Sequence, residues 1–379
     1  MAMFYQAPAI SVNTPKPWDE SRLGWLALAW FDGFGTRTLH RLAKRYGGRG
    51  DKALACTLED LLAANVTEKV AARFFGFRRE TDTERLARKM EEEGVSLMLD
   101  SDEDYPPRLK QISDPPFALF VRGPKIFSEL EIAIVGTRNC TPYGRNVTIE
   151  LAHDLARSGL GIVSGLALGV DAYAHGAALE DGGRCIAVLG GGCDDGSIYP
   201  RHNLKLAQEI LGGGGTIISE FPPGTFSLKH HFPLRNRIIA GLCRAVVVVE
   251  AAEESGSLIT AHLALEQNRD VFAVPGPITS EQSRGTNKLL KLGAIPCTGA
   301  ADILTHLELT ADSPKPRQTV PLTPEEEAVC DALDQPRHAD ELGRILDLDA
   351  ATIATRLMGL ELKGRVKSEG GQMYTKSRH

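Results

Sequence analysis

The chain has 379 residues, of which 42% are hydrophobic and 24% charged, as in an ordinary globular protein of about two or three domains. Its formal net charge of −6 excludes a surface that is basic all over, so any nucleic-acid site must be small and sharply placed. The seven cysteines include no Cys-x-x-Cys pair, which predicts reduced thiols and no zinc site.

Residues 1–18 are predicted to form a flexible tail, because they combine several prolines and alanines with no hydrophobic periodicity. They lack the basic and apolar regions of a secretory signal. No apolar run in the chain approaches the length of a membrane span. We therefore expect a cytoplasmic protein that makes no contact with a membrane.

Residues 19–80 are predicted to be helical throughout. A Gly-Phe-Gly turn precedes an amphipathic segment in which Leu39, Leu42 and Tyr46 share one face at helical spacing. Such a unit fits a helix-hairpin-helix (SAM-like) domain, with amides near Gly33 and Gly35 facing a phosphate. The alternative, which the sequence favours slightly, is a small helical bundle with a glycine turn.

Residues 81–309 are predicted to form an α/β domain. A charged helix at 81–94 and two short strands at 95–100 and 117–121 lead into continuous apolar strands that alternate with helices such as 146–158 and 258–268. The apolar strands are 132–136, 161–165, 185–190, 216–220, 245–251 and 271–276. This alternation indicates an extended Rossmann-like parallel sheet that is covered on both faces. Ligands of such sheets bind at the carboxyl ends of the strands.

A Pro-rich linker at 310–322 precedes a small C-terminal domain at 323–379. Thr323 and Pro324 are a helix cap and a first helical residue, and two further amphipathic segments follow as a helix-turn-helix. A hairpin around Gly370 and Gly371 closes the chain. This order predicts a winged helix.

The first apolar strand of the domain ends in Gly136, Thr137 and Arg138, just before a helix. The GxGxxG fingerprint of dinucleotide sites is missing. A helix N-terminus and an Arg fork still favour an anion here. The alternative is that Arg138 pairs with a structural carboxylate.

The second strand leads through Ser164, Gly165 and Gly169 into a helix, so that backbone amides can approach a phosphate closely. Asp171 is expected to cap that helix. His175 follows one turn later and is expected to be a core or cap residue.

The densest cationic segment contains Lys229, Phe232, Arg235, Asn236 and Arg237. Cations that hold phosphates beside a ring that stacks on a base suit a single strand of nucleic acid. The Arg-Asn-Arg motif is also expected to open a helix. In the alternative, the arginines pair with buried glutamates (220 and 250) and the ring is core. The set as a whole favours binding.

Ser255, Gly256 and Ser257 form a third small-residue loop before a helix on the same edge of the sheet. We find no Ser/His/Asp arrangement, no metal-ligand spacing and no Walker A sequence. The sequence therefore predicts a binding protein with no catalytic set, no metal and no cofactor.

The strings IAIVGTR, SGLALGVDAYAH, YPRHN, SEFPPG, FPLRNRIIAGL, ESGSLITA and VFAVPG occur in this order. Together they resemble the DNA-processing protein A (DprA/Smf) family over roughly residues 104–300. The resemblance implies a Rossmann-like domain that binds single-stranded DNA, forms a homodimer and loads the RecA recombinase during natural transformation. It assigns strand contacts to Arg138, Lys229 and Phe232, to the Arg-Asn-Arg motif and to the loops 165–169 and 255–257. It implies neither catalysis nor a cofactor.

Two other functions compete with this one. The segment after strand 245–251 has a distant likeness to phosphoribohydrolases, a class of nucleotide hydrolase, but lacks their double glycine and acid. A transcription regulator would need a basic recognition helix in the winged helix. That helix offers only Arg356, with Lys363, Arg365 and Lys367 after it.

Overall fold

The computed structural model describes residues 18–309, 322–363 and 365–376. Contacts divide the chain into two compact units, one ending at residue 314 and the other starting at residue 315. The tail predicted at 1–18 and the linker predicted at 310–322 lie, except for their last residues, outside the described residues. The predicted helical and Rossmann-like segments share the first unit.

The first unit is built on one nine-stranded sheet with the order β1-β2-β6-β5-β4-β3-β7-β8-β9. The strands from β6 to β9 all run parallel, whereas β2 is antiparallel to both of its neighbours. The strands are β1 (Val95–Leu99), β2 (Ala118–Arg122), β3 (Glu131–Val135), β4 (Gly161–Ser164), β5 (Cys185–Leu189), β6 (Thr216–Ser219), β7 (Ala245–Val248), β8 (Asp270–Ala273) and β9 (Ile295–Pro296). The predicted α/β class with a mostly parallel sheet is confirmed.

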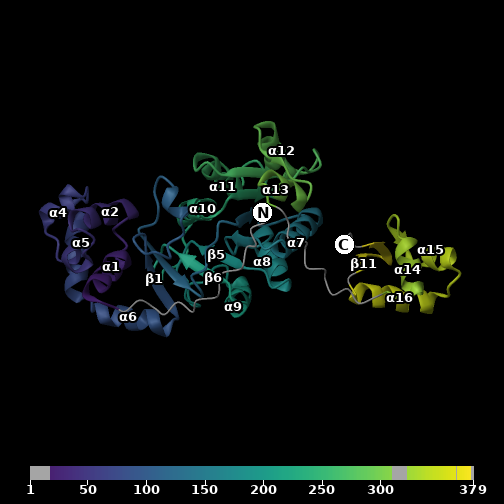
Figure 1. The fold of residues 1–379 in the computed structure, drawn as a ribbon, viewed down its shortest axis with the longest axis horizontal. Helices are drawn as coiled ribbons and strands as arrows, with labels where there is room; N and C mark the ends of the chain where they lie inside the picture. Colours follow the sequence, from purple (N-terminus) through teal and green to yellow (C-terminus); the bar gives the residue numbers. More distant parts are fainter. Residues whose placement is uncertain (1–17, 310–321, 364, 377–379) are drawn as a thin grey trace, which may run out of the picture. The chain divides into compact units, whose positions relative to one another are not determined.

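Alternate residues of each strand enter two separate hydrophobic cores, because side chains alternate across a sheet. In β3, Ile132 and Ile134 belong to one core, and Ala133 and Val135 to the other. Helices α7, α8 and α9 cover the first face, and α10, α11 and α12 the second (Figure 1). The covering helices are α7 (Pro142–Arg157), α8 (Val170–Glu180), α9 (Leu204–Gly212), α10 (His231–Leu242), α11 (Gly256–Glu266), α12 (Arg284–Lys291) and α13 (Ala300–His306).

Six helices precede the sheet, as the sequence predicts, and pack beside its β1 edge (Figure 1). The Trp25 ring lies 4.7 Å from the Phe117 ring, centroid to centroid. At the start of α2, the Thr36 hydroxyl donates to Pro115 O (2.9 Å) and accepts from Phe117 N (2.7 Å). The helices are α1 (Glu20–Trp30), α2 (Thr36–Arg45), α3 (Gly50–Leu54), α4 (Leu58–Ala63), α5 (Glu68–Glu80) and α6 (Thr83–Glu92). The start of α2, next to the turn at residues 33–35, is therefore anchored against the chain before β2.

The second unit is a winged helix, as predicted. Thr323 caps its first helix in a reciprocal capping box with Glu326, and Pro324 is the first helical residue. The hairpin turns at Gly370 and Gly371. Its elements are α14 (Pro324–Asp331), β10 (Arg337–His338), α15 (Ala339–Leu346), α16 (Ala350–Leu362), β11 (Val366–Gly370) and β12 (Met373–Lys376). Lys363, after α16, forms an ion pair with Glu326 (2.7 Å).

A largely buried ion pair fastens α1 to the segment after β1. Arg22 Nη2 lies 3.0 Å from Asp102 Oδ2, and the same oxygen accepts from Leu99 N (2.9 Å). Removing one member of such a pair leaves an uncompensated buried charge, so we expect Asp102→Ala to lower the free energy of unfolding by about 3–5 kcal/mol. Urea unfolding followed by tryptophan fluorescence measures this, since the three tryptophans lie at residues 18, 25 and 30.

The matched control is Asp51→Ala, which breaks the Arg49–Asp51 pair (2.8 Å) whose arginine is half-exposed. We expect a much smaller loss of stability there, because water screens exposed pairs. Equal losses from the two substitutions would show that the buried pair does not hold α1 in place.

Candidate functional site

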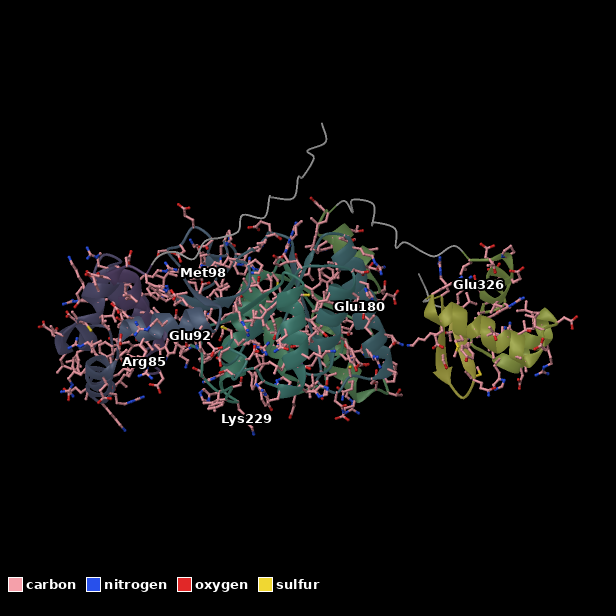
Figure 2. The ribbon with its side chains drawn as sticks, turned by 90° about the horizontal axis from the view of Figure 1, so that it is seen from below. Arg85, Glu92, Met98, Glu180, Lys229 and Glu326 are labelled. Carbon is pink, nitrogen blue, oxygen red and sulfur yellow. The ribbon has the colours of Figure 1, made fainter. Side chains whose placement is uncertain are left out.

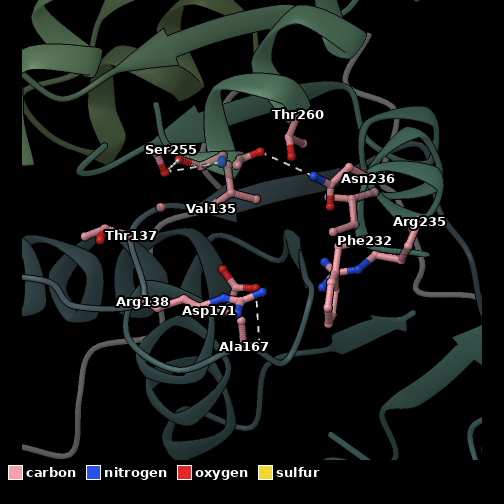
Figure 3. Close-up of a pocket in the computed structure, with 14 residues that line it drawn as sticks. Val135, Thr137, Arg138, Ala167, Asp171, Phe232, Arg235, Asn236, Ser255 and Thr260 are labelled. Atoms are coloured by element: carbon pink, nitrogen blue, oxygen red, sulfur yellow. Dashed lines mark hydrogen bonds between the residues drawn. The ribbon is translucent and has the colours of Figure 1, made fainter. Parts of the chain in front are cut away.

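The site lies where the order of the strands reverses direction. From β3 the chain builds β4, β5 and β6 on one side and then crosses back to place β7 on the other side. The loops after β3 and β7 leave in opposite directions, so a crevice opens between them at the carboxyl ends of the strands. A pocket of about 330 Å³ occupies this place (Figure 3). We call it the switch-point pocket; it is lined by Val135, Gly136, Thr137, Arg138, Ala167, Asp171, Phe232, Arg235, Asn236, Ile239, Ser255, Gly256, Ser257 and Thr260.

The loop between β3 and α7 brings Arg138 to the mouth of this pocket. Buried Glu250 holds the loop, because its carboxylate accepts from Thr141 Oγ1 (2.6 Å) and Thr141 N (2.8 Å), while its carbonyl accepts from Thr137 N (2.8 Å). The exposed Arg138 pairs with no carboxylate of the described chain. Its guanidinium instead lies 5.0 Å from the centroid of the Phe232 ring. Arg138 is thus free to meet a ligand.

Arg235 is buried to 5% exposure and still lines the switch-point pocket. Its Nη2 donates to Gly165 O (3.1 Å), and no carboxylate among the residues that the structure describes lies within ion-pair distance of it. Burial lowers the pKa of Arg235 to about 10, against the opposing effect of Asp171, so the group remains charged at neutral pH. A Cβ on Gly165 would lie 1.6 Å from Arg235 Nη1, so any side chain at this position would displace the guanidinium.

Buried polar side chains shape the loop between β4 and α8. Asp171 Oδ2 accepts from Gly165 N (3.0 Å) and Ala167 N (3.3 Å), and Asn203 Nδ2 donates to Ala167 O (3.1 Å). Asp171 thus holds the loop. The prediction that Asp171 caps α8 is wrong, because the N-cap residue is Gly169, which has a φ of +75°. Burial raises the pKa of the Asp171 carboxyl above its ordinary value, although Arg235 opposes that shift.

The N-terminus of α11 forms the opposite wall. Ser255 is its N-cap and accepts a hydrogen bond from Ser257 N (3.4 Å), and Asn236 Nδ2 donates to Gly256 O (3.4 Å). The predicted third loop therefore faces the same pocket as the loop after β3. Free amides and the helix dipole favour an anion at such a terminus.

Phe232 stands between two hollows. It lines the switch-point pocket and also a second hollow of about 40 Å³ with Leu168, Tyr199 and Pro200. Its ring lies 5.9 Å from the Arg235 guanidinium and 6.3 Å from the Tyr199 ring. The ring is half-buried at the surface, which contradicts the alternative of a core phenylalanine. Because α10 begins at His231, the expectation that Arg235 opens a helix is wrong by one turn.

The structure brings nine of the predicted site residues together at the switch-point pocket: Gly136, Thr137, Arg138, Phe232, Arg235, Asn236, Ser255, Gly256 and Ser257. Gly165 lines the second hollow. Lys229 is exposed outside both hollows and projects from the ribbon (Figure 2).

Three predicted residues lie away from the pocket surface. Ser164 is buried and donates to Ile134 O (2.7 Å), and Gly169 lies under the loop after β3. Arg237 is sealed by Glu220 (2.6 Å) and Asp114 (3.3 Å), so the alternative of a carboxylate pair applies to this arginine. Helix geometry explains why Arg237 is away from the pocket that Arg235 lines, because residues two apart on α10 point to different sides.

Sequence reasoning did not select Tyr199 or Asn203. Tyr199 is 52% exposed beside Phe232, and Asn203 is buried and bonds the loop after β4. The string YPRHN drew attention to residues 199–203 but did not show which side chains face the site. Only the fold places them there.

Comparison with known proteins agrees with this site. Residues 96–308 match the family described as DNA recombination-mediator protein A, and residues 313–372 match the DprA winged helix domain. The chain belongs to this family. Protein Smf of Escherichia coli is 38% identical over 321 residues, covering 82% of this chain and 85% of that protein. DNA processing protein DprA of Bacillus subtilis is 45% identical over 218 residues, covering 57% of this chain and 72% of that protein.

Two solved structures of family members resemble this fold. The structure of DprA from Streptococcus pneumoniae superposes with a TM-score of 0.64 at 34% identity, covering 76% of this chain and 98% of that chain. A structure of DprA from Helicobacter pylori, whose subject is its single-stranded DNA binding mode, gives a TM-score of 0.50 at 33% identity over 56% of this chain and 95% of that chain. The sequence resemblance to DprA/Smf is confirmed.

Within 18–309, 322–363 and 365–376, no cluster of His, Cys, Asp and Glu is arranged to hold a metal ion. None of the helices in these ranges combines the length and apolarity of a membrane span.

Beneath the loop after β4, His175 is completely buried in α8. Burial lowers the pKa of His175 from 6.5 to about 4. The nearby Ser164 backbone raises this pKa, but by less than burial lowers it. The unfolded chain therefore binds this proton more readily, and the folded state loses stability as the pH falls from 6.5 to 4. We expect a loss of about 2 kcal/mol between pH 7 and pH 4.5, which urea unfolding at these two pH values measures.

The substitution His175→Leu should flatten this pH dependence because it removes the titrating ring. The control His202→Gln changes an exposed histidine and should leave the pH dependence as in the parent. An unchanged slope in His175→Leu would contradict the assignment.

Proposed function

We propose that this protein binds single-stranded DNA across the switch-point pocket and the Phe232 ring. The observation that carries the proposal is the pair of guanidinium groups, from Arg138 and Arg235, that flank one half-exposed ring and have no carboxylate partner in the described chain. Cations of this kind hold phosphates, while a ring between them stacks on a base.

The negative net charge of the chain is compatible with single-strand binding, because the cationic side chains of the proposed site lie at one edge of the sheet. We propose that Lys229, which is exposed outside the pocket, contacts a further phosphate of the strand. The net charge of −6 excludes a surface that is basic all over and is compatible with a narrow cationic site. The single-strand binding named for the H. pylori relative supports the same assignment.

We further propose that the protein delivers the bound strand to a RecA recombinase during natural transformation, as a homodimer formed through the Rossmann-like domain. The family description as a recombination mediator supports the first part. The hydrolase alternative is disfavoured, because Asp171 and Glu250, two carboxylates next to the pocket, both accept hydrogen bonds from loop amides.

Substitutions at the ring and at the free arginine test strand binding. Phe232→Ala should weaken binding of an oligothymidylate by about 5- to 150-fold, the equivalent of about 1–3 kcal/mol for a lost stack. Arg138→Ala should weaken binding and reduce the slope of log affinity against log salt by about 0.7, the value for one phosphate. Fluorescence anisotropy at several salt concentrations measures both.

The control is Arg88→Ala, which removes an equal charge from an exposed position on α6. Its affinity and salt slope should match those of the parent. If the variants at 232 and 138 also bind like the parent, strand binding at this site is excluded.

Gly165 offers a second test at a position that no strand needs to touch. In Gly165→Ala, the added Cβ displaces the Arg235 guanidinium, whose Nη1 lies 1.6 Å from that point. We expect strand affinity to fall at least as far as in Arg235→Ala, while the unfolding midpoint changes little. In the double variant Gly165→Ala/Arg235→Ala, strand affinity should equal that of Arg235→Ala alone, because the guanidinium that the added Cβ would displace is absent. An additive loss would mean that Gly165 acts independently of Arg235.

Recombinase loading needs its own measurement. The rate at which RecA filaments form on single-stranded DNA coated with single-strand binding protein should rise with the parent protein and not with Arg138→Ala. A parent protein that binds the strand and leaves this rate unchanged would restrict the function to strand binding.

A further inference from the structure

Helix α2, outside the switch-point pocket, presents a row of cationic side chains to solvent. Arg37, Arg41 and Lys44 are exposed, and their spacing of four and three residues places them on one face of the helix. Leu39 and Leu42 are buried on the opposite face. The three cations, which we call the α2 row, therefore point away from the core of the helical bundle.

The α2 row belongs to a local excess of positive charge. Residues 33–58 include six Lys and Arg residues and one acid, Asp51, although acids outnumber Lys and Arg in the whole chain. Asp51 already pairs with Arg49 (2.8 Å). Among the residues that the structure describes, no carboxylate lies within ion-pair distance of any member of the row. The charges of the row are thus available to an external partner.

Helix stability does not account for the whole row. The helix dipole favours a cation in the last turn, which explains Lys44. Arg37 lies in the first turn, where the dipole disfavours a cation and where α2 has no acidic residue. A row that extends over both ends of the helix fits the repeated charges of a polyanion.

The row lacks the features that a single strand or a protein partner would use. Helix α2 contains no Phe, Tyr or Trp, so a base would find no ring to stack on. It exposes no large hydrophobic side chain, whereas the centre of a protein interface is usually apolar. Cations alone are sufficient to hold the sugar-phosphate backbone of a duplex, whose bases are paired inside.

The start of α2 lies at the same edge of the sheet as the switch-point pocket. Thr36 bonds Pro115 and Phe117, just before β2. Because β2 is antiparallel to β6, the start of β2 lies at the carboxyl ends of the parallel strands. Four strand spacings of about 4.8 Å separate β2 from β3, so α2 begins about 20 Å along this edge from the pocket. The loop after β6, an intervening strand, exposes Lys229 and Phe226.

We propose that the α2 row binds the backbone of a DNA duplex, so that the protein holds a junction between duplex and single strand. The junction rests on the proposed function, because its single strand occupies the switch-point pocket and the Phe232 ring. The duplex lies on α2, and its single-stranded extension follows the sheet edge to the pocket. Cations alone bind the duplex, and cations with a ring bind the strand.

The test compares three fluorescent DNAs by anisotropy at several salt concentrations. They are a blunt duplex, an oligothymidylate, and the same duplex with that oligothymidylate as a tail. Joining the two parts makes the second binding event intramolecular. We therefore expect the parent protein to bind the tailed duplex about 100-fold or more tightly than either part.

Arg37→Ala/Lys44→Ala is the diagnostic variant. It leaves Arg41 in place, because that side chain also donates to Ala64 O (2.9 Å). The blunt duplex should bind about tenfold or more weakly, and its salt slope should fall by about 0.9 for each cation removed. The oligothymidylate should bind as it does to the parent.

The matched control is Arg79→Ala/Arg85→Ala, which removes two exposed cations from α5 and α6. It should change the affinity of neither the duplex nor the oligothymidylate. Phe232→Ala should give the reverse of the diagnostic pattern, with a weaker oligothymidylate and an unchanged blunt duplex. Unfolding midpoints of all three variants exclude misfolding as the cause.

The outcomes separate this inference from the proposed function. A blunt duplex that does not bind, or that binds the α2 variant as tightly as the parent, overturns the inference and leaves strand binding standing. An equal loss for duplex and oligothymidylate assigns the row to the single strand and also overturns it. A tailed duplex bound no more tightly than its parts overturns the junction. Failure of the oligothymidylate alone overturns the proposed function and leaves duplex binding at α2.

Discussion

A single hydrogen bond, from Arg235 Nη2 to Gly165 O (3.1 Å), fixes the charged group around which the site is organised. It places a buried guanidinium, with no carboxylate of the described residues within ion-pair distance, under the place where strand order reverses. A buried charge with no directly bonded counter-ion is unfavourable, and in the proposed function a phosphate of the strand supplies this partner.

The loops around Arg235 hold their shape through acids that serve as hydrogen-bond acceptors. Glu250 holds the loop after β3 and Asp171 the loop after β4. Using carboxylates in this way keeps the backbone in place and leaves Arg138 and Arg235 without ion-pair partners among the residues that the structure describes. This division of roles explains how a chain with a net charge of −6 presents a cationic pocket.

Arg237 shows that two arginines of one motif can have different partners. It belongs to the same Arg-Asn-Arg motif as Arg235, yet Glu220 and Asp114 seal it on the other side of α10. Burial raises the pKa of Glu220 even with this arginine beside it, so the pair is a structural contact inside the protein. Of two neighbouring arginines, one thus lines the pocket and the other is a structural contact.

Local sequence signals were sufficient to predict the strands, the turns and the family of this protein. Continuous apolar runs form buried parallel strands, and Thr323 and Gly370 mark a helix start and a hairpin, because these signals act between near neighbours. Only the tertiary structure decided which side chains of the predicted site meet. Arg235 bonds a residue 70 positions away, and Arg237 one 123 positions away. Spacing along the chain carries no information on such contacts, since they arise when distant loops converge at the edge of one sheet.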